Sequence, residues 1–373
     1  MPTNPSSPPF RADHVGSLLR PERLLKAREQ FRNGQLAQEQ LRSEEDQAVR
    51  AVVRLQEDLG LKSITDGEFR RQLWHTDFLM QFANVATGRT GMTAKFHTDA
   101  GTIEREMTSF RITGRIERRH PIFVSHFAFL KDVTSKTAKI TIPSPTVLHF
   151  RGGRDAVDKT AYPDIEDFFG DLAAAYRQEI HDLDETGCTY LQIDEVNFAY
   201  LCDPALRAQV EAIGENPDEL TRRYARLIND AIAEWPAGMT VALHLCRGNF
   251  EGAWLAEGGY DHVAETLFNA IQVDAYFLEY DTPRAGDFKP LRFVPPDKKV
   301  VLGLVSTKTP VLEAKADLKR RIDEAAQSIP LEQLALSPQC GFASGERGNK
   351  ITFDDELAKL SLIVETAAEV WGD

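Results

Sequence analysis

The chain is poor in cysteine and lacks long hydrophobic runs. Only 4 of its 373 residues are cysteines, too few for a disulfide scaffold. No run of about 18 apolar residues occurs, so no transmembrane helix is predicted. Basic residues (44) are outnumbered by acidic ones (57), and the net charge of −13 argues against non-specific binding to nucleic acid or to an anionic membrane.

The start of the chain also lacks the features of an export signal. Residues 1–9 have neither a basic beginning nor an apolar core, and we expect them to form a disordered tail. Unpaired cysteines are expected to stay reduced, so the cytoplasm is the predicted compartment. The hydrophobic share of 42% and the charged share of 27% are ordinary for a soluble globular protein.

Short apolar runs of strand type alternate with stretches of helical periodicity. The runs cover residues 10–17, 63–68, 138–143, 189–195, 240–246, 273–279, 299–305 and 333–338. Helices are expected at 172–183, 216–235 and 354–371, and another is expected to open at Thr309-Pro310. This alternation predicts the α/β class and a (β/α)8 TIM barrel that forms a single catalytic domain over residues 1–373. A doubly wound open sheet is the alternative, but no Gly-x-Gly-x-x-Gly follows the first strand.

One segment interrupts the alternation. Residues 88–137 contain two short apolar runs, 110–116 and 121–124, which predict an inserted β-hairpin between the second and third barrel units. The hairpin is interpreted as a lid, a dimer arm or a decoration, and a homo-oligomer is possible.

Polar side chains stand where the predicted strands end. In a barrel of this type the active site is built at the carboxyl ends of the strands, and a carboxylate placed there costs free energy unless it is paired or binds a ligand. The residues concerned are Ser17, Asp66, Glu68, Asp194, Glu195, His244, Cys246, Glu279, Lys308 and Cys340. Their number at one end of the barrel indicates a functional site.

The most specific of these elements is the pair His244 and Cys246. Residues i and i+2 of a strand point to the same side, so both can reach one metal ion. Cys340 and Glu279 are placed to complete the site, and a His/Cys/Cys/Glu set favours Zn2+ over an oxygen-preferring cation because thiolates are soft ligands. The competing interpretation is that these cysteines are ordinary core residues, which we do expect of Cys188 and Cys202.

These residues, in this order, resemble a known family. The pattern of His244-x-Cys246, Glu279 and Cys340, together with 193–195 and 66–68, is similar to the catalytic barrel of cobalamin-independent methionine synthase. The segment 14–20, His-Val-Gly-Ser-Leu-Leu-Arg, followed by Pro21, looks like the beginning of the short single-barrel bacterial members of that family. The resemblance runs from about residue 10 to the end of the chain.

The resemblance implies a zinc-dependent transfer of a methyl group to the thiol of homocysteine. It implies that His244, Cys246, Glu279 and Cys340 hold the zinc ion. It further implies that Asp194 and Glu68 bind the amino group of homocysteine and that Ser17 helps to bind its carboxylate. Arg247 is taken as a further substrate-binding residue. Two carboxylates suit an ammonium group, and zinc lowers the pKa of a bound thiol. Pairing of Glu68 with Arg70 or Arg71 is the structural alternative.

Departures from the family pattern concern the methyl donor. The full-length enzymes carry two barrels, whereas this chain has room for one. Where they carry a catalytic histidine after the seventh strand, this chain has Lys308, which we take as the catalytic residue in that place. No tryptophan for stacking on a pterin follows the third strand; His149 or Phe150 is available there, although packing is the more frequent role. The donor therefore stays open between a methylated folate, a methyl-corrinoid and another small methyl compound.

Three other functions are compatible with parts of this pattern. An epoxyalkane:coenzyme M transferase would use the same zinc thiolate on a sulfonated thiol, with Arg247, Arg70 or Arg71 binding the sulfonate. A non-catalytic zinc-binding accessory protein would leave the two substrate carboxylates unexplained. A metal-dependent hydrolase would use more histidine and carboxylate ligands and fewer thiolates, because it activates water.

Overall fold

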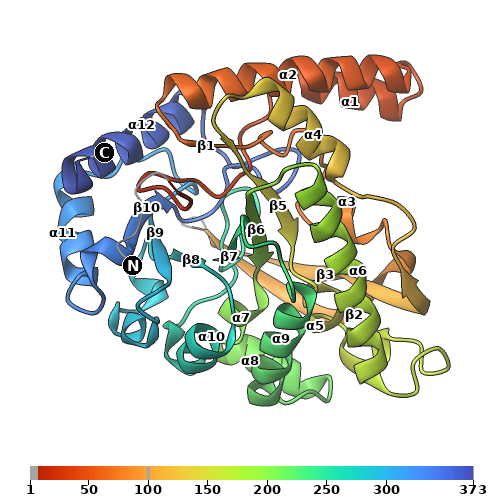
Figure 1. The fold of residues 1–373 in the computed structure, drawn as a ribbon. Helices are drawn as coiled ribbons and strands as arrows, with labels where there is room; N and C mark the ends of the chain where they lie inside the picture. Colours follow the sequence, from red (N-terminus) through yellow and green to blue (C-terminus); the bar gives the residue numbers. More distant parts are fainter. Residues whose placement is uncertain (1–6, 99–100, 373) are drawn as a thin grey trace.

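The computed structural model describes residues 7–98 and 101–372. Most of the predicted disordered tail, residues 1–6, lies outside this range. Parallel strands form the centre of the molecule and helices surround them (Figure 1). None of the described helices is both long enough and apolar enough to cross a membrane.

The strands form a barrel, and most strands that follow one another in the sequence also pair with each other. The parallel strands are β1 (Ser63–Ile64), β4 (Thr137–Ala138), β5 (Ile140–Pro143), β6 (Tyr190–Glu195), β7 (Thr240–Leu245), β8 (Ala275–Glu279), β9 (Lys299–Val305) and β10 (Leu334–Pro338). Strands β5 to β10 pair in order as one parallel sheet, and β1 pairs with β4. The predicted TIM-barrel architecture is confirmed. The carboxyl ends of these strands therefore lie at one mouth of the barrel.

The first predicted strand, 10–17, is much shorter than expected. Its ladder contact is a single parallel bridge from Ala12 to Leu336 of β10, supported by two backbone hydrogen bonds of 2.8 and 3.0 Å. Side-chain bonds replace the missing ladder. The buried Asp13 carboxylate accepts hydrogen bonds from Ser63 Oγ (2.7 Å), Lys139 Nζ (3.2 Å) and Tyr190 Oη (2.9 Å). This buried cluster joins the first segment to the strands that follow.

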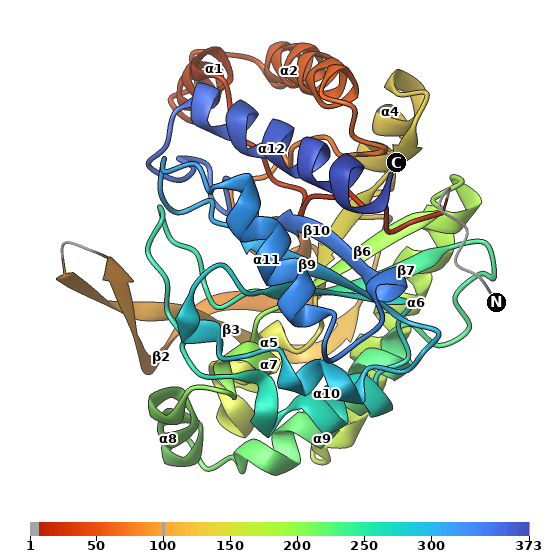
Figure 2. The same cartoon turned by 90° about the vertical axis from the view of Figure 1, so that its left-hand side faces the viewer.

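The helices form the outer layer of the barrel (Figures 1 and 2). Their bounds are α1 Glu22–Arg32, α2 Gln38–Asp58, α3 Thr76–Leu79, α4 Val124–Val133, α5 Val147–Phe150, α6 Ile165–Glu185, α7 Asn197–Tyr200, α8 Pro204–Ala212, α9 Pro217–Ala231, α10 Ala264–Ala270, α11 Lys315–Ala325 and α12 Phe353–Trp371. The predicted helices at 172–183, 216–235 and 354–371 correspond to α6, α9 and α12. The fourth predicted helix corresponds to α11, but its predicted start at Thr309-Pro310 is wrong, because α11 begins at Lys315. The residues before it make other contacts: Glu313 accepts a hydrogen bond from the Ser306 amide.

The inserted hairpin is present, but only one of its two predicted strands is confirmed: residues 110–116 lie within β3 (Gly101–Glu117), whereas 121–124 do not form a strand. Strand β2 (Ala83–Thr98) pairs antiparallel with β3 (Gly101–Glu117). The apolar run 121–124 is not a strand; it leads into α4, and the buried Glu179 carboxylate accepts hydrogen bonds from the amides of Ile122 and Phe123 before this helix. A four-residue apolar run does not by itself distinguish a strand from a helix start. The hairpin reaches past the body of the molecule in Figure 2.

The stability of the fold depends on pH through one buried carboxyl group. Glu356, in the first turns of α12, is 0% exposed and accepts one hydrogen bond, from the Leu19 amide (2.8 Å). Burial raises the pKa of Glu356 to about 8. Between the ordinary glutamate pKa and pH 8, Glu356 is ionised in the unfolded chain but protonated in the folded chain. The free energy of unfolding therefore falls as the pH rises towards 8.

We therefore expect Glu356→Gln to stabilise the protein at alkaline pH. The amide keeps an acceptor for Leu19 without the cost of ionisation. Urea unfolding at pH 5 and pH 8.5 should show a smaller loss of unfolding free energy in the variant than in the wild type, by on the order of 1 kcal/mol or more. Glu365→Gln, a change at an exposed position of the same helix, serves as the control. Equal pH dependence in Glu356→Gln and wild type would contradict the assignment.

Candidate functional site

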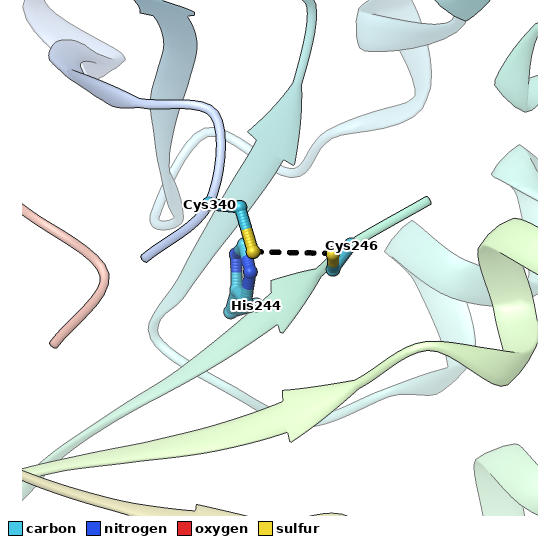
Figure 3. Close-up of side chains that lie close together, drawn as sticks. All are labelled: His244, Cys246 and Cys340. Atoms are coloured by element: carbon cyan, nitrogen blue, oxygen red, sulfur yellow. Dashed lines mark hydrogen bonds between the residues drawn. The ribbon is translucent and has the colours of Figure 1, made fainter. Parts of the chain in front are cut away.

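Three side chains that could hold a metal ion meet inside the barrel mouth. His244 lies in β7, Cys246 directly follows β7, and Cys340 follows β10. Their ligand atoms all lie within 4.8 Å of one another, and all three residues are buried (Figure 3). The two sulfur atoms are 3.2 Å apart although the residues are 94 positions apart in the sequence.

The chemistry of this trio fits a soft metal ion. Neither ring nitrogen of His244 has a hydrogen-bond partner among the described residues, although the side chain is buried. An unsatisfied buried imidazole costs free energy, which a metal ion bound to the ring would remove. The hydrogen bond from Cys246, helped by His244, lowers the pKa of Cys340 well below its usual value, while the same contact raises the pKa of Cys246. A lowered thiol pKa favours the thiolate, the form that binds metals.

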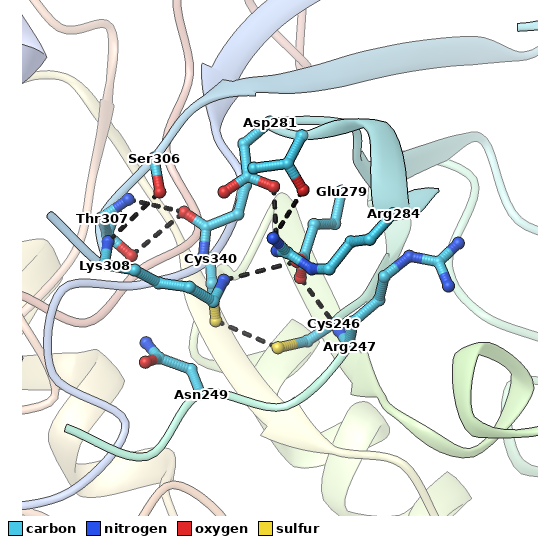
Figure 4. Close-up of polar contacts among 12 residues, drawn as sticks. Cys246, Arg247, Asn249, Glu279, Asp281, Arg284, Ser306, Thr307, Lys308 and Cys340 are labelled. Carbon is cyan, nitrogen blue, oxygen red and sulfur yellow. Dashed lines mark hydrogen bonds and ion pairs between the residues drawn. The ribbon is translucent and has the colours of Figure 1, made fainter. Parts of the chain in front are cut away.

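Glu279 lies beside the trio but does not join it. Its carboxylate accepts hydrogen bonds from the Arg247 amide (3.0 Å), from Arg284 and from Lys308 Nζ (3.3 Å), as Figure 4 shows. Burial would raise the pKa of Glu279, but Lys308 and Arg284 lower it to about 2. Glu279 is thus a fully buried, ionised carboxylate at the edge of the metal-binding cluster, held by two cations.

The cavity beside the trio has a volume of about 470 Å³. Ser17, Glu68 and Asp194 line it together with His244, Cys246 and Cys340, so the structure brings these six predicted residues to one space. Its size is typical of a site for small ligands. Carboxylates, a hydroxyl group and a soft metal-binding cluster can together bind a small amino acid that carries a thiol.

Each of the predicted substrate carboxylates is fixed by its neighbours. Gln192 donates to both the Val15 carbonyl and Asp194 Oδ1, each at 2.7 Å. Burial, opposed in part by His244, raises the pKa of Asp194 to about 7. Glu68 Oε1 accepts a hydrogen bond from Thr141 (2.8 Å) and pairs with Arg71 Nη1 (3.5 Å), as the structural alternative predicted. Its other oxygen has no partner among the described residues. Glu68 has a left-handed φ of 60°, a strained conformation that such a residue adopts mainly at functional sites.

Arg20, in the segment 14–21, ties together the loops that carry these groups. Its guanidinium donates to the carbonyls of Glu68 (2.8 Å), Arg71 (3.0 Å), Ala343 (3.2 Å) and Gly345 (3.1 Å). The first two belong to the loop after β1 and the others to the loop after Cys340. The loop after Cys340 also comes very close to the first segment. A Cβ atom at Gly341 would lie 1.9 Å from Ser17 Oγ, so only glycine fits there.

Besides Glu279, two predicted site residues do not line the cavity. The guanidinium of Arg247 is 0% exposed, lies 4.4 Å from the Tyr260 ring and points away from the sulfur pair in Figure 4. Lys308 is turned towards Glu279 and does not line the cavity. Among the alternatives after the third strand, His149 bonds to Tyr224 and Phe150 packs against Tyr200; neither lines the cavity.

The cavity also contains residues that the sequence did not indicate. Ala94 and Phe96 of β2 and Met107 of β3 line it, so the inserted hairpin covers part of the barrel mouth. The hairpin is attached there through two backbone hydrogen bonds between His97 and Trp254, of 2.7 and 3.1 Å, and through the stacking of their rings. No local motif marks these residues, because their role depends on where the hairpin folds. Of the interpretations given above, the contacts favour a lid.

Comparison with known proteins identifies relatives over nearly the whole chain. The family model described as "Cobalamin-independent synthase, Catalytic domain" matches residues 10–369. YxjG of Bacillus subtilis is 45% identical, with 98% of this chain and 95% of the relative covered. The methionine synthase of Saccharolobus solfataricus is 27% identical, with 88% and 86% covered. A crystal structure from Listeria monocytogenes is 37% identical, with a TM-score of 0.77 and 98% and 99% covered.

Removal of one sulfur ligand is expected to abolish tight metal binding. In Cys340→Ala the affinity for a thiophilic divalent ion should fall at least about 100-fold, more than the loss of a neighbour that only orients a ligand. Dialysis against metal-free buffer followed by elemental analysis measures this. Cys188→Ala, a buried cysteine whose sulfur bonds to the Tyr190 carbonyl, is the matched control. Equal metal retention in both variants would contradict the site.

Proposed function

Since the chain belongs to the family of cobalamin-independent methionine synthases, we propose that it transfers a methyl group to the thiol of homocysteine and so forms methionine. The observation that carries the proposal is the position of the His244, Cys246 and Cys340 trio in one cavity with Ser17, Glu68 and Asp194. A thiol-activating cluster and an ammonium-binding pair of carboxylates are thus available to one ligand. That combination matches an amino acid with a thiol side chain.

The proposed zinc ligands are His244, Cys246 and Cys340. Glu279 is the proposed fourth ligand, and it would have to give up its contacts with Arg284 and Lys308 to bind the ion. Zinc supplies one property, a lowered pKa of the bound substrate thiol. Lys308 acts on the site through Glu279 and is a positioning residue in this proposal, since its ammonium is 3.3 Å from that carboxylate.

Asp194 and Glu68 bind the ammonium group of homocysteine in this proposal, and Ser17 binds its carboxylate. Gln192 holds Asp194 in place, and Thr141 holds Glu68. The unpartnered oxygen of Glu68 is the acceptor left for the substrate. Both groups are on the α-carbon, so these contacts would hold that end of homocysteine and leave the thiol at its other end free to reach the trio.

The three arginines considered above as partners of a sulfonate are engaged elsewhere. Arg70 pairs with Glu45 (3.3 Å) and Asp46 (2.6 Å), and Arg71 donates to the side chain and carbonyl of Thr141. Arg247 lies against Tyr260, outside the cavity lining. Arg151 and Arg347 do line the cavity, so the preference for homocysteine over coenzyme M rests on Asp194 and Glu68, which suit an ammonium group.

Calorimetric titration of the zinc-loaded protein with homocysteine tests the proposal. We expect binding with proton release, seen as a dependence of the heat on the ionisation enthalpy of the buffer, because the thiol becomes a thiolate. Asp194→Asn should weaken binding about 10- to 100-fold, the effect of losing a charge-assisted hydrogen bond.

Asp274→Asn is the control for this titration. Asp274 precedes β8 at the opposite end of the barrel and accepts a hydrogen bond from the Val241 amide. It should leave homocysteine affinity unchanged. Binding of coenzyme M in place of homocysteine would overturn the assignment of the thiol, and binding of neither would overturn the proposed activity.

A further inference from the structure

Aromatic rings from separate parts of the chain line the cavity beside the metal-binding trio. Trp74 comes from the loop before α3, Phe96 from the hairpin strand β2, and Phe250 from the loop after β7. The centroids of the Phe96 and Phe250 rings are 5.3 Å apart. These side chains are polarisable faces beside the place where the methyl group is transferred. Such faces attract cations as well as apolar groups.

A carboxylate accompanies the rings. Glu251 follows Phe250 and lines the same cavity. Its φ of 49° is left-handed, a conformation that costs a non-glycine residue free energy, and the only other cavity-lining residue of this kind among the described non-glycine residues is Glu68. The chain thus bears a conformational cost to place Glu251 beside the aromatic rings.

The charge of the methyl donor decides whether its leaving group needs a proton. A methyl group on a neutral amine leaves behind a strongly basic nitrogen unless that nitrogen is protonated. The basic residue after the seventh barrel strand is Lys308, whose ammonium bonds to Glu279 and lies outside the cavity lining. A donor with a positively charged sulfur or nitrogen needs no such proton, because its leaving group departs neutral.

We propose that Trp74, Phe96, Phe250 and Glu251 form the binding site for the methyl donor, and that this donor is a methylated onium compound, either a sulfonium or a quaternary ammonium. The inference rests on the proposed function and extends it to the second substrate. The homocysteine thiolate attacks the methyl carbon and a sulfur–carbon bond forms. The bond from carbon to the onium atom breaks, and its electron pair stays on that atom, which becomes a neutral thioether or amine. The thiol proton is already lost when homocysteine binds.

Binding of a cation in the absence of homocysteine tests the site without turnover. Tetramethylammonium should bind the zinc-loaded protein at least tenfold more tightly than the neutral tert-butanol, which has a similar shape. Glu251→Gln and Phe96→Ala should each weaken tetramethylammonium about tenfold while leaving zinc content and homocysteine affinity unchanged. Lys95→Ala, an exposed neighbour of Phe96 on the opposite face of β2, is the matched control. Equal affinities for the cation and the alcohol would overturn the proposal. So would an affinity for tetramethylammonium that neither Glu251→Gln nor Phe96→Ala changes.

Turnover distinguishes the donor classes. Mass spectrometry should detect methionine formed from homocysteine with trimethylsulfonium or S-methylmethionine, if the onium atom is sulfur, or with tetramethylammonium, if it is nitrogen. Methionine formed from 5-methyltetrahydrofolate and from none of the onium compounds would overturn the proposal. Failure of the wild type to bind homocysteine would instead contradict the proposed function, while the tetramethylammonium titration would still decide whether the aromatic site binds an onium ion.

Discussion

The closure of the barrel by its first segment is the constraint on which the site depends. This segment makes only one ladder bridge, at Ala12. Two charged side chains do what the ladder does elsewhere. Asp13 accepts hydrogen bonds from Ser63, Lys139 and Tyr190 inside the barrel, and Arg20 donates to four loop carbonyls at its mouth. Because backbone carbonyls and buried charges must be satisfied, these bonds also set the positions of the loops that carry Glu68 and Cys340.

Charge is distributed in the mouth according to function. The cations Arg284 and Lys308 lie behind Glu279 and keep it ionised. The carboxylates Asp194 and Glu68 face the cavity, where an ammonium group would satisfy them. The sulfur pair lies between these two regions. A thiol can therefore reach the trio from the cavity. On the side of Glu279, protein side chains fill the space.

The hairpin converts an open barrel mouth into a bounded cavity. Its contacts with the loop after β7 bring Phe96 and Met107 over the trio, although their strands lie far from His244 in the sequence. The role of this insertion was left open by the sequence, and β2 was not predicted because it contains several alanines and glycines, which are depleted in strands. Pairing with β3 and burial of alternate side chains stabilise a strand whose own propensity is low.

The amino-acid sequence by itself determined the barrel, its strand order and the types of residue at the mouth. Alternation of apolar runs and helical stretches is a local signal, and the spacing His244-x-Cys246 puts two ligands on one side of any strand. Only the tertiary structure decided which of these residues meet. The direction of a side chain after a strand end depends on the conformation of the loop. Cys340 therefore reaches Cys246, whereas Arg247, which follows Cys246 in the sequence, turns to Tyr260. Lys308 turns to Glu279. Long-range packing, which no local pattern encodes, likewise decided that the hairpin covers the cavity.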